Sequence, residues 1–320
     1  MNRLLEALIR RARVLALLCA AGLLLPWLAR LLAEFEGRLP WLLDLGAHWQ
    51  WLYAAGLLLC GALAALRQPR WLLTLPFAAL PWLSAAPRAP ARTAVASPTL
   101  GIAIANVQHG NPQPQPMLDW FAATRPDLVI VLEASTALAP KLAALPGYPH
   151  QRIEPADDPF GIAVLSRFPL TAVGVQHDEF GIARIEAQLE WQGHCVDLVA
   201  WHPMPPLSPA YRQARDRRLR ELAARAHGGP RIVAGDLNAS PWSSAFAGLD
   251  DLGLRRASGL APTWPSAGRG VVGIPIDQVL VSRHWAVRAA ERGPDIGSDH
   301  YPLRVELVLD ADATHAACAP

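Results

Sequence analysis

Three apolar runs dominate the first 86 residues and cover positions 14–32, 49–66 and 71–86. The first run is interrupted only by Pro26 and Arg30, and it is long enough to cross a bilayer as a helix. Trp and Arg residues near the ends of the runs are typical of interfacial anchors. The third run is short and contains two prolines. The pattern predicts a transmembrane region over residues 1–86 with three helices.

A cleaved signal peptide is the alternative for the first run, because an Arg-rich start followed by an apolar core suits both. No small-x-small cleavage site follows Leu25, and Leu18 before Cys19 is unlike a lipoprotein site. A signal peptide also leaves the two later apolar runs unexplained. We therefore expect membrane anchoring through the N-terminal helices, with the lipid bilayer as a partner.

The arginines predict the orientation of this region. Positive residues collect on the cytoplasmic side, and they occur before the first run and between the second and third runs. The residues are Arg3, Arg10, Arg11, Arg13, Arg67 and Arg70. Three spans place everything after residue 86 outside the cytoplasm, whereas two spans reverse that placement.

Beyond residue 86 the pattern changes to short apolar runs between polar turns. Residues 87–98, rich in Pro, Ala and Arg, predict a linker, and residues 311–320 predict a disordered tail. The intervening residues 99–310 contain both expected strands and expected helices, which indicates an α/β domain. The expected strands are 102–107, 128–132, 161–166, 183–189, 195–200, 232–234, 274–282 and a last one ending at 309, with helices at 117–124 and 211–226.

Charge divides the chain in the same way as hydropathy. The whole chain has a formal charge of +2 and is 52% apolar. Residues 1–98 contain ten Arg and four acidic residues, about +6, which leaves about −4 for the remainder. A domain that binds nucleic acid non-specifically is expected to be basic, so nucleic acid is a possible but not a favoured partner.

The cysteines suggest no site. Cys19 and Cys60 lie in apolar runs, Cys195 in an expected strand and Cys318 in the tail, and no CxxC pair occurs. We therefore expect neither a zinc site nor a disulfide framework.

Polar side chains stand where expected strands end. Asp236 and Asn238, two apart on an extended segment, point the same way and can hold a water or a hard cation between them. Glu133 and His202 each follow another strand. Taken singly, Asp and Asn are also turn formers, Glu133 suits a solvated loop, and His202 suits a structural histidine.

Taken in chain order, these residues resemble the motif series of the endonuclease/exonuclease/phosphatase superfamily, and in particular its bacterial membrane-anchored branch. The likeness covers about residues 99–310 and rests on Asn106, Glu133, His202, Gly235-Asp236-Leu237-Asn238, Asp277 within Ile276-Asp277-Gln278-Val279, and Ser298-Asp299-His300. It implies a four-layer α/β sandwich, in which two mixed sheets pack face to face with helices outside. It also implies hydrolysis of phosphoesters with Mg²⁺ or Mn²⁺.

The resemblance assigns the metal site to three residues. Glu133 matches the principal metal ligand, with Asn106 and Asp299 beside it. A hard cation held by carboxylate and amide oxygens would neutralise a phosphodiester, which otherwise repels nucleophiles.

The resemblance assigns catalysis to five further residues. Asp236 and Asn238 match the pair that positions the water and the scissile phosphate. His300 matches the phosphate-facing histidine, oriented by Asp277, and His202 stands where pancreatic deoxyribonucleases and sphingomyelinases have a histidine. Imidazoles exchange protons near neutral pH, so the two histidines would supply an acid and a base.

Two departures from the family pattern concern individual contacts. Leu132 precedes Glu133 where the family often has Gln. No carboxylate can be identified as the partner of His202.

Together these features predict a phosphodiester hydrolase anchored in the bacterial inner membrane, with a periplasmic catalytic domain. The substrate stays open between nucleic acid, a phospholipid head group and a small phosphate ester.

An alternative function is a catalytically idle binding or scaffold domain with the same fold. Loss of Glu133, Asp236 or His300 would mark such a domain, and all three are present. A serine hydrolase built from Ser298, Asp299 and His300 is disfavoured, because adjacent residues of one segment cannot form the relay and no GxSxG elbow occurs.

Overall fold

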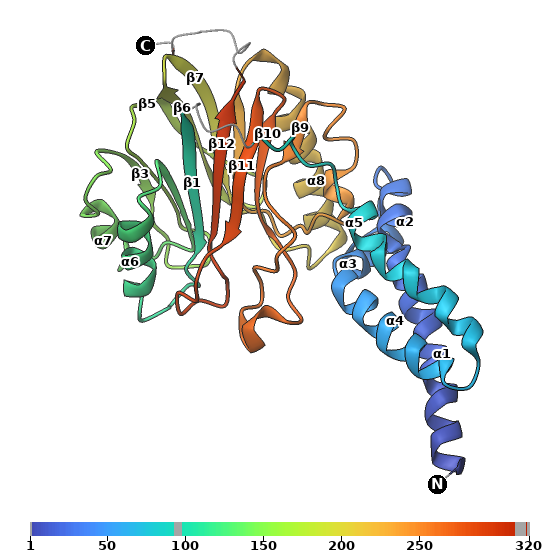
Figure 1. Cartoon of the computed structure of the whole chain (residues 1–320). Coiled ribbons are helices and arrows are strands. Elements are labelled where there is room, and N and C mark those ends of the chain that lie inside the picture. The colour runs from blue at the N-terminus through green and yellow to red at the C-terminus, as the bar shows by residue number, and fades with distance from the viewer. Residues whose placement is uncertain (1, 93–97, 311–317, 319–320) are drawn as a thin grey trace. The chain divides into compact units, whose positions relative to one another are not determined.

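The computed structural model describes residues 2–92, 98–310 and 318, which form two compact units (Figure 1). The first unit comprises Met1–Ala86, Pro206–Asp216 and Pro241–Ala247. The second comprises Pro87–Pro205, Arg217–Ser240 and Gly248–Pro320. Two short segments from the middle of the predicted catalytic domain thus belong to the unit of the N-terminal helices.

One sheet of the second unit has the strand order β11-β12-β1-β2-β4-β3. In this sheet only β1 and β2 run parallel, and the other neighbours are antiparallel. The strands are β1 Thr99–Asn106, β2 Leu128–Leu132, β3 His150–Glu154, β4 Ile162–Ser166, β11 Trp285–Arg292 and β12 Leu303–Leu309.

The other sheet has the order β5-β6-β7-β8-β10-β9. Here β7 and β8 are the parallel pair, and the remaining neighbours are antiparallel. The strands are β5 Leu170–His177, β6 Ala183–Trp191, β7 His194–Trp201, β8 Arg231–Asp236, β9 Leu254–Arg256 and β10 Asp277–Ser282.

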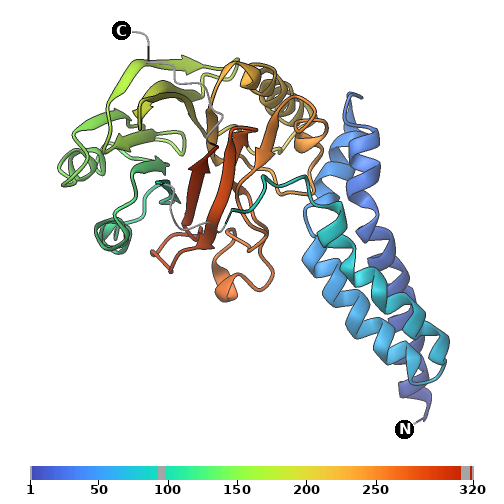
Figure 2. The ribbon, with the colours of Figure 1, turned by 45° about the horizontal axis from the view of Figure 1, so that its top comes forward.

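Alternation along β1 shows how the layers pack. Ile102 and Ile104 lie in a buried cluster to which both sheets contribute, whereas Ala103 and Ala105 lie in a second cluster with residues of helix α6 (Gln115–Thr124). Successive strand residues face opposite sides, so one face of the sheet meets the other sheet and the opposite face meets helices. The later helices include α7 (Ala139–Ala143) and α8 (Pro209–Ala224). The predicted four-layer α/β sandwich is therefore confirmed (Figure 1, Figure 2).

The N-terminal part of the first unit is helical, with boundaries that differ from the predicted ones. Helix α1 begins at Asn2, and the third expected span is a 3-10 segment followed by a short helix, because prolines at 76 and 81 lack the N–H that an α-helix needs. One helix, Arg3–Leu31, is long and apolar enough to cross a membrane, and Gln50–Ala65 is a shorter apolar helix. The elements are α1 Asn2–Leu23, α2 Leu25–Leu31, α3 Arg38–Ala47, α4 Gln50–Ala65, η1 Pro69–Ala79 and α5 Leu80–Ser84.

The first part of the predicted linker, residues 87–92, has defined backbone hydrogen bonds within the second unit. Ala89 N donates to Arg256 O over 2.7 Å, and Val287 N donates to Pro90 O over 2.8 Å. Residues 93–97 of that linker, and the predicted tail except Cys318, lie outside the described residues.

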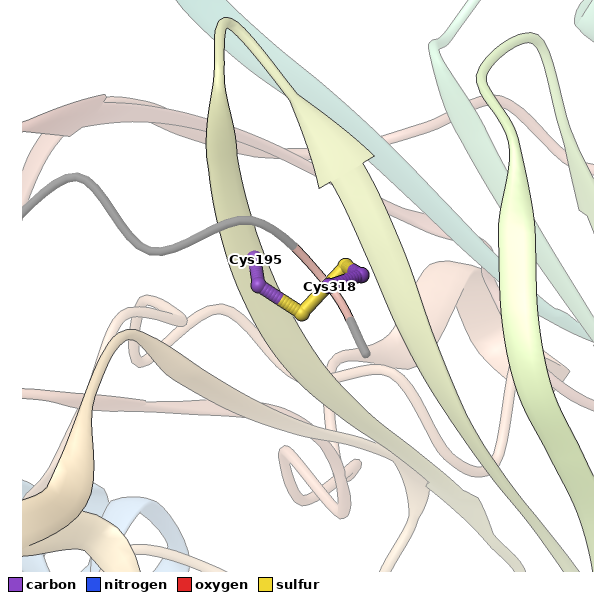
Figure 3. The surroundings of a disulfide bond; sticks show 2 residues. All are labelled: Cys195 and Cys318. Atoms are coloured by element: carbon purple, nitrogen blue, oxygen red, sulfur yellow. A yellow bond between two sulfur atoms is a disulfide. The ribbon is translucent and has the colours of Figure 1, made fainter. Parts of the chain in front are cut away.

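A disulfide joins Cys195 in β7 to Cys318 (Figure 3), while Cys19 and Cys60 are free thiols. The expectation that the cysteines form no disulfide was wrong for this pair. The two residues are 123 positions apart, so no local spacing of cysteines in the sequence predicts the bond.

Candidate active site

Strand ends from both sheets supply the predicted site residues. Asn106 ends β1 and Glu133 follows β2, and these two strands run parallel so that their ends coincide. Asp236 ends β8 and pairs across the ladder with Asp277, the first residue of β10. His202 directly follows β7, which runs parallel to β8.

Asn106 links the acidic residues of the two sheets. Its Nδ2 donates to Glu133 Oε1 over 2.9 Å and to Asp236 Oδ2 over 3.2 Å. Its Oδ1 accepts a hydrogen bond of 3.0 Å from Gln108 N. The second carboxylate oxygen of Glu133 accepts from His109 N. The amide nitrogen of Asn106 is therefore the atom that points toward the Glu133 and Asp236 carboxylates. It orients these carboxylates, whereas the amide oxygen of Asn106 points toward Gln108 N.

His300 and Asp277 form a buried pair beside Asp236. His300 Nδ1 lies 2.9 Å from Asp277 Oδ2, and His300 Nε2 lies 3.6 Å from Asp236 Oδ2. Burial by itself lowers the pKa of the His300 imidazole, but the Asp277 carboxylate, followed by Asp236 and Asp299, raises it to about 9. In the absence of metal, His300 is therefore protonated at neutral pH and can donate from Nε2.

His202 lies close to the same carboxylate oxygen. Its Nε2 lies 3.6 Å from Asp236 Oδ2, and its side chain is only 5% exposed. Among the described residues, His202 Nδ1 is buried and has no hydrogen-bond partner. This agrees with the sequence, in which no carboxylate could be identified as a partner of His202. The Phe160 ring lies 5.6 Å from the imidazole, which positions His202 by packing.

The backbone around Asp236 is held in an uncommon conformation. Asn238 has a φ of +48°, its N donates to Asp236 Oδ1 over 2.9 Å, and its Nδ2 donates to Pro203 O over 3.1 Å. A Cβ at Gly235, where φ is +151°, would lie 2.0 Å from Trp201 O. Glu133 has a φ of +60°, so two of the proposed functional side chains project from left-handed positions, which cluster at functional sites.

Asp299 is held by residues that the sequence analysis did not single out. Trp264 Nε1 donates to Asp299 Oδ2 over 3.0 Å, and Asp299 N donates to Gln108 Oε1 over 3.2 Å. Ser298 Oγ donates to Asn106 O over 2.8 Å and accepts from His300 N. Ser298 belongs to one of the family-like motifs, whereas Trp264 belongs to none of them.

The charges of the site fit a cation. Among the described residues, Asp236 and Asp277 form ion pairs with histidines only. In the same part of the chain, neither Glu133 nor Asp299 forms an ion pair with an Arg or Lys residue. Asp236, Asp277 and His300 could together hold a metal ion, since one ligand atom from each lies within 4.8 Å of the others. Mg²⁺ prefers oxygen ligands, so the carboxylate oxygens around Glu133 are better hard-cation donors than a set that includes the His300 imidazole.

Similar folds occur among solved structures, all at low sequence identity. An endonuclease/exonuclease/phosphatase from Beutenbergia cavernae DSM 12333 is 21% identical with a TM-score of 0.54, covering 66% of this chain and 72% of its own. D. rerio TDP2, complexed with a single strand DNA product, is 16% identical with a TM-score of 0.55, covering 65% and 98%. The 3′ phosphatase NExo from Neisseria, bound to a product DNA hairpin, is 20% identical with a TM-score of 0.53, covering 64% and 98%.

Sequence comparison identifies the family. No curated protein sequence matches the chain significantly. Residues 103–300, more than half of the chain, match the profile of one family and include all the strand-end residues described above. The protein therefore belongs to the Endonuclease/Exonuclease/phosphatase family.

Proposed function

We propose that this protein is a membrane-anchored, divalent-metal-dependent hydrolase of phosphodiesters. One observation carries the proposal: Asp236 Oδ2 lies within 3.6 Å of both buried imidazoles, His202 and His300, and accepts from Asn106. Such convergence of acid, base and amide groups on one point suits proton transfer to and from a phosphate ester.

Mg²⁺ or Mn²⁺ would be held by Glu133 and Asp299, with Asn106 orienting the Glu133 carboxylate. When bound, the ion supplies neutralisation of the phosphate charge and stabilisation of the leaving oxygen. The left-handed backbone at Glu133 and its two hydrogen bonds fix the carboxylate before any ligand arrives.

The remaining groups act on protons and orientation. Asp236 positions the attacking water and accepts its proton, with Asn238 beside the scissile phosphate. His300, held through Nδ1 by Asp277, donates from Nε2 to a phosphoryl oxygen, where negative charge increases during the reaction. His202 Nε2 faces the same space and exchanges a proton with the substrate.

The proposed location is the bacterial inner membrane, with the catalytic domain in the periplasm. Asp44 and Arg215 form a buried ion pair within the first unit, so both residues belong on one side of the membrane. The chain between Asp44 and Arg215 must then cross the membrane an even number of times. One crossing by α4 and one by the η1–α5 segment meet this condition. The Cys195–Cys318 disulfide also favours an oxidising compartment.

Many large apolar side chains of residues 1–86 are exposed, which supports a lipid environment for this region. Leu4 is 81% exposed, Leu59 72% and Leu73 77%. Contiguous apolar surface of this kind is rare on proteins surrounded by water.

Hydrolysis of bis-p-nitrophenyl phosphate by the full-length protein in detergent tests the proposed chemistry. We expect turnover with Mg²⁺ or Mn²⁺, none with EDTA, and at least about a 100-fold loss in Glu133→Gln and His300→Gln. Glu190→Gln, an exposed acid of β6, is the matched control and should keep full activity. Absence of both turnover and Mn²⁺ binding by calorimetry would favour the idle binding domain instead.

A further inference from the structure

The first unit contains a buried polar cluster that the proposed chemistry does not use. We call it the Asp44 cluster, and its members are Asp44, Arg212, Arg215, Asp216, Ser243 and Ser244. All six are buried, and Asp44, Arg212, Arg215 and Asp216 are at most 2% exposed. The cluster combines one residue of α3, three of the segment Pro206–Asp216 and two of the segment Pro241–Ala247.

Asp44 is the centre of the cluster. Its Oδ2 accepts from Arg215 Nη2 over 2.9 Å. Its Oδ1 accepts from Ser243 Oγ over 2.8 Å and from Ser244 N over 2.6 Å. One carboxylate of α3 therefore fixes the position of both inserted segments.

The two arginines complete the network with defined geometry. Arg215 also pairs with Asp216 at 2.8 Å, and Arg212 Nη1 lies 3.3 Å from Asp216 Oδ2. Arg212 Nη2 donates over 2.9 Å to the carbonyl oxygen of Phe35, a residue of the connection between α2 and α3. Four buried charges stabilise a protein no more than a well-packed apolar core would, but their hydrogen bonds are directional and therefore favour one arrangement of the segments.

The inserted segments are the direct continuations of the active-site loops. Pro206 follows Pro203 by three residues, and Pro203 O accepts from Asn238 Nδ2. Pro241 follows Asn238 by three residues and begins the other inserted segment. Within the first unit Arg30 Nη2 donates to Pro241 O over 3.0 Å, and Trp242 Nε1 donates to Pro81 O over 2.8 Å.

We propose that the N-terminal helices do more than anchor the enzyme: through Asp44 they position the loops that carry His202, Asp236 and Asn238. Asp44 is thus a positioning residue for the reaction, acting through the chain segments that continue into these loops. This inference rests on the proposed phosphodiesterase function. A purely local role in the stability of the first unit is the competing explanation.

The test uses the full-length protein in detergent with Asp44→Asn, which keeps the size of the side chain and removes its charge. Glu36→Gln is the matched control, because Glu36 is an exposed acid of the connection that precedes α3. For Asp44→Asn we expect kcat for bis-p-nitrophenyl phosphate to fall about 10-fold with KM changed less than about threefold, measured well below the melting temperature. A purely structural role would lower the melting temperature and leave kcat per folded molecule unchanged.

Hydrogen exchange followed by mass spectrometry gives a readout independent of turnover. Peptides that cover residues 199–205 and 234–240 should exchange faster in Asp44→Asn than in the wild type and in Glu36→Gln. Neither peptide includes an atom of the Asp44 cluster, so a change there reports positioning. Exchange and kcat both equal to wild type in a folded Asp44→Asn would overturn the inference.

Two outcomes need a second measurement. If Asp44→Asn does not fold, Ser243→Ala, which removes only the hydroxyl between Asp44 and Arg215, is judged by the same two criteria. If the wild type shows no metal-dependent turnover, the proposed function fails, and the exchange data alone decide whether Asp44 positions these loops.

Discussion

His300 Nδ1 and Asp277 Oδ2 lie 2.9 Å apart, and both residues are buried. Asp277 opens β10 directly opposite Asp236 of β8, so the ladder between these strands sets the position of the carboxylate. The pair therefore fixes the imidazole in one orientation with Nε2 toward Asp236.

Asp277→Asn should lower kcat by roughly 100-fold, because the amide neither fixes the required tautomer nor stabilises the imidazolium. The proposed metal ligands are unchanged, so Mn²⁺ affinity by calorimetry should stay within about threefold of wild type. Glu190→Gln serves as control. Wild-type kcat in a folded Asp277→Asn variant would show that His300 acts without this partner.

Gly235→Ala should prevent folding or destabilise the second unit by more than about 3 kcal/mol. The new Cβ would lie 2.0 Å from Trp201 O, a backbone atom that β7 holds in place. Gly229→Ala is the control, since a Cβ at that position would have no atom within 4 Å and its φ of 168° suits any residue. Thermal unfolding of both variants measures the difference, and similar melting temperatures would contradict the close approach of β7 and β8.

Asp44 should make stability depend on pH in the acidic range. Burial raises the pKa of the Asp44 carboxyl, but Arg215 above all, with His48, Ser244 and Ser243, lowers it from 3.8 to about 2. A lowered pKa in the folded state stabilises the protein above the unfolded pKa, and this contribution, about 2 kcal/mol, is lost as pH falls from about 4 to about 2.

The melting temperature of wild type in detergent should therefore exceed that of Asp44→Asn at pH 6, and the difference should shrink toward about pH 2.5. Glu36→Gln, which has the same change of formal charge at an exposed position, should show no such convergence. A difference that stays constant over this range would mean that the Asp44 charge contributes no stability.

Thiol titration tests the disulfide. Denatured, unreduced protein should show two reactive thiols, Cys19 and Cys60, and reduction should raise the number to four. Cys195→Ser should lower the free energy of unfolding of the second unit by about 3 kcal/mol, because the bond closes a long loop. Four reactive thiols before reduction would exclude the bond.

Reporter fusions test the proposed orientation. Alkaline phosphatase, which is active only outside the cytoplasm, should be active when fused after Asp310 or His48 and inactive after Gln68. Activity after Gln68, or its absence after Asp310, would contradict three crossings.

The family resemblance of the motifs predicted the sandwich, and the apolar runs of the sequence predicted where several of its strands end. Ile130 and Leu132 are core residues, and the next residue, Glu133, is a candidate site residue. Local pattern does not encode contacts between distant segments. The bond from Trp264 to Asp299 and the network around Asp44 join residues far apart in the chain, and neither residue type nor spacing distinguishes them. The orientation of the Asn106 amide, with its nitrogen toward the carboxylates, is set by the hydrogen bond from Gln108 N to its oxygen. This orientation could not be predicted from the sequence.

Each sheet contains one parallel strand pair, and each pair contributes one half of the candidate site: Asn106 and Glu133 from β1 and β2, His202 and Asp236 from β7 and β8. The proposed function needs both halves, so we expect turnover to depend on the alignment of the two sheets, which share one apolar core. Enlarging or truncating a side chain in that interface, such as Ile104 or Val279, should reduce turnover before the circular dichroism of the strands changes. Enzymatic rate is then a more sensitive reporter of inter-sheet registry than any spectroscopic measure of secondary structure.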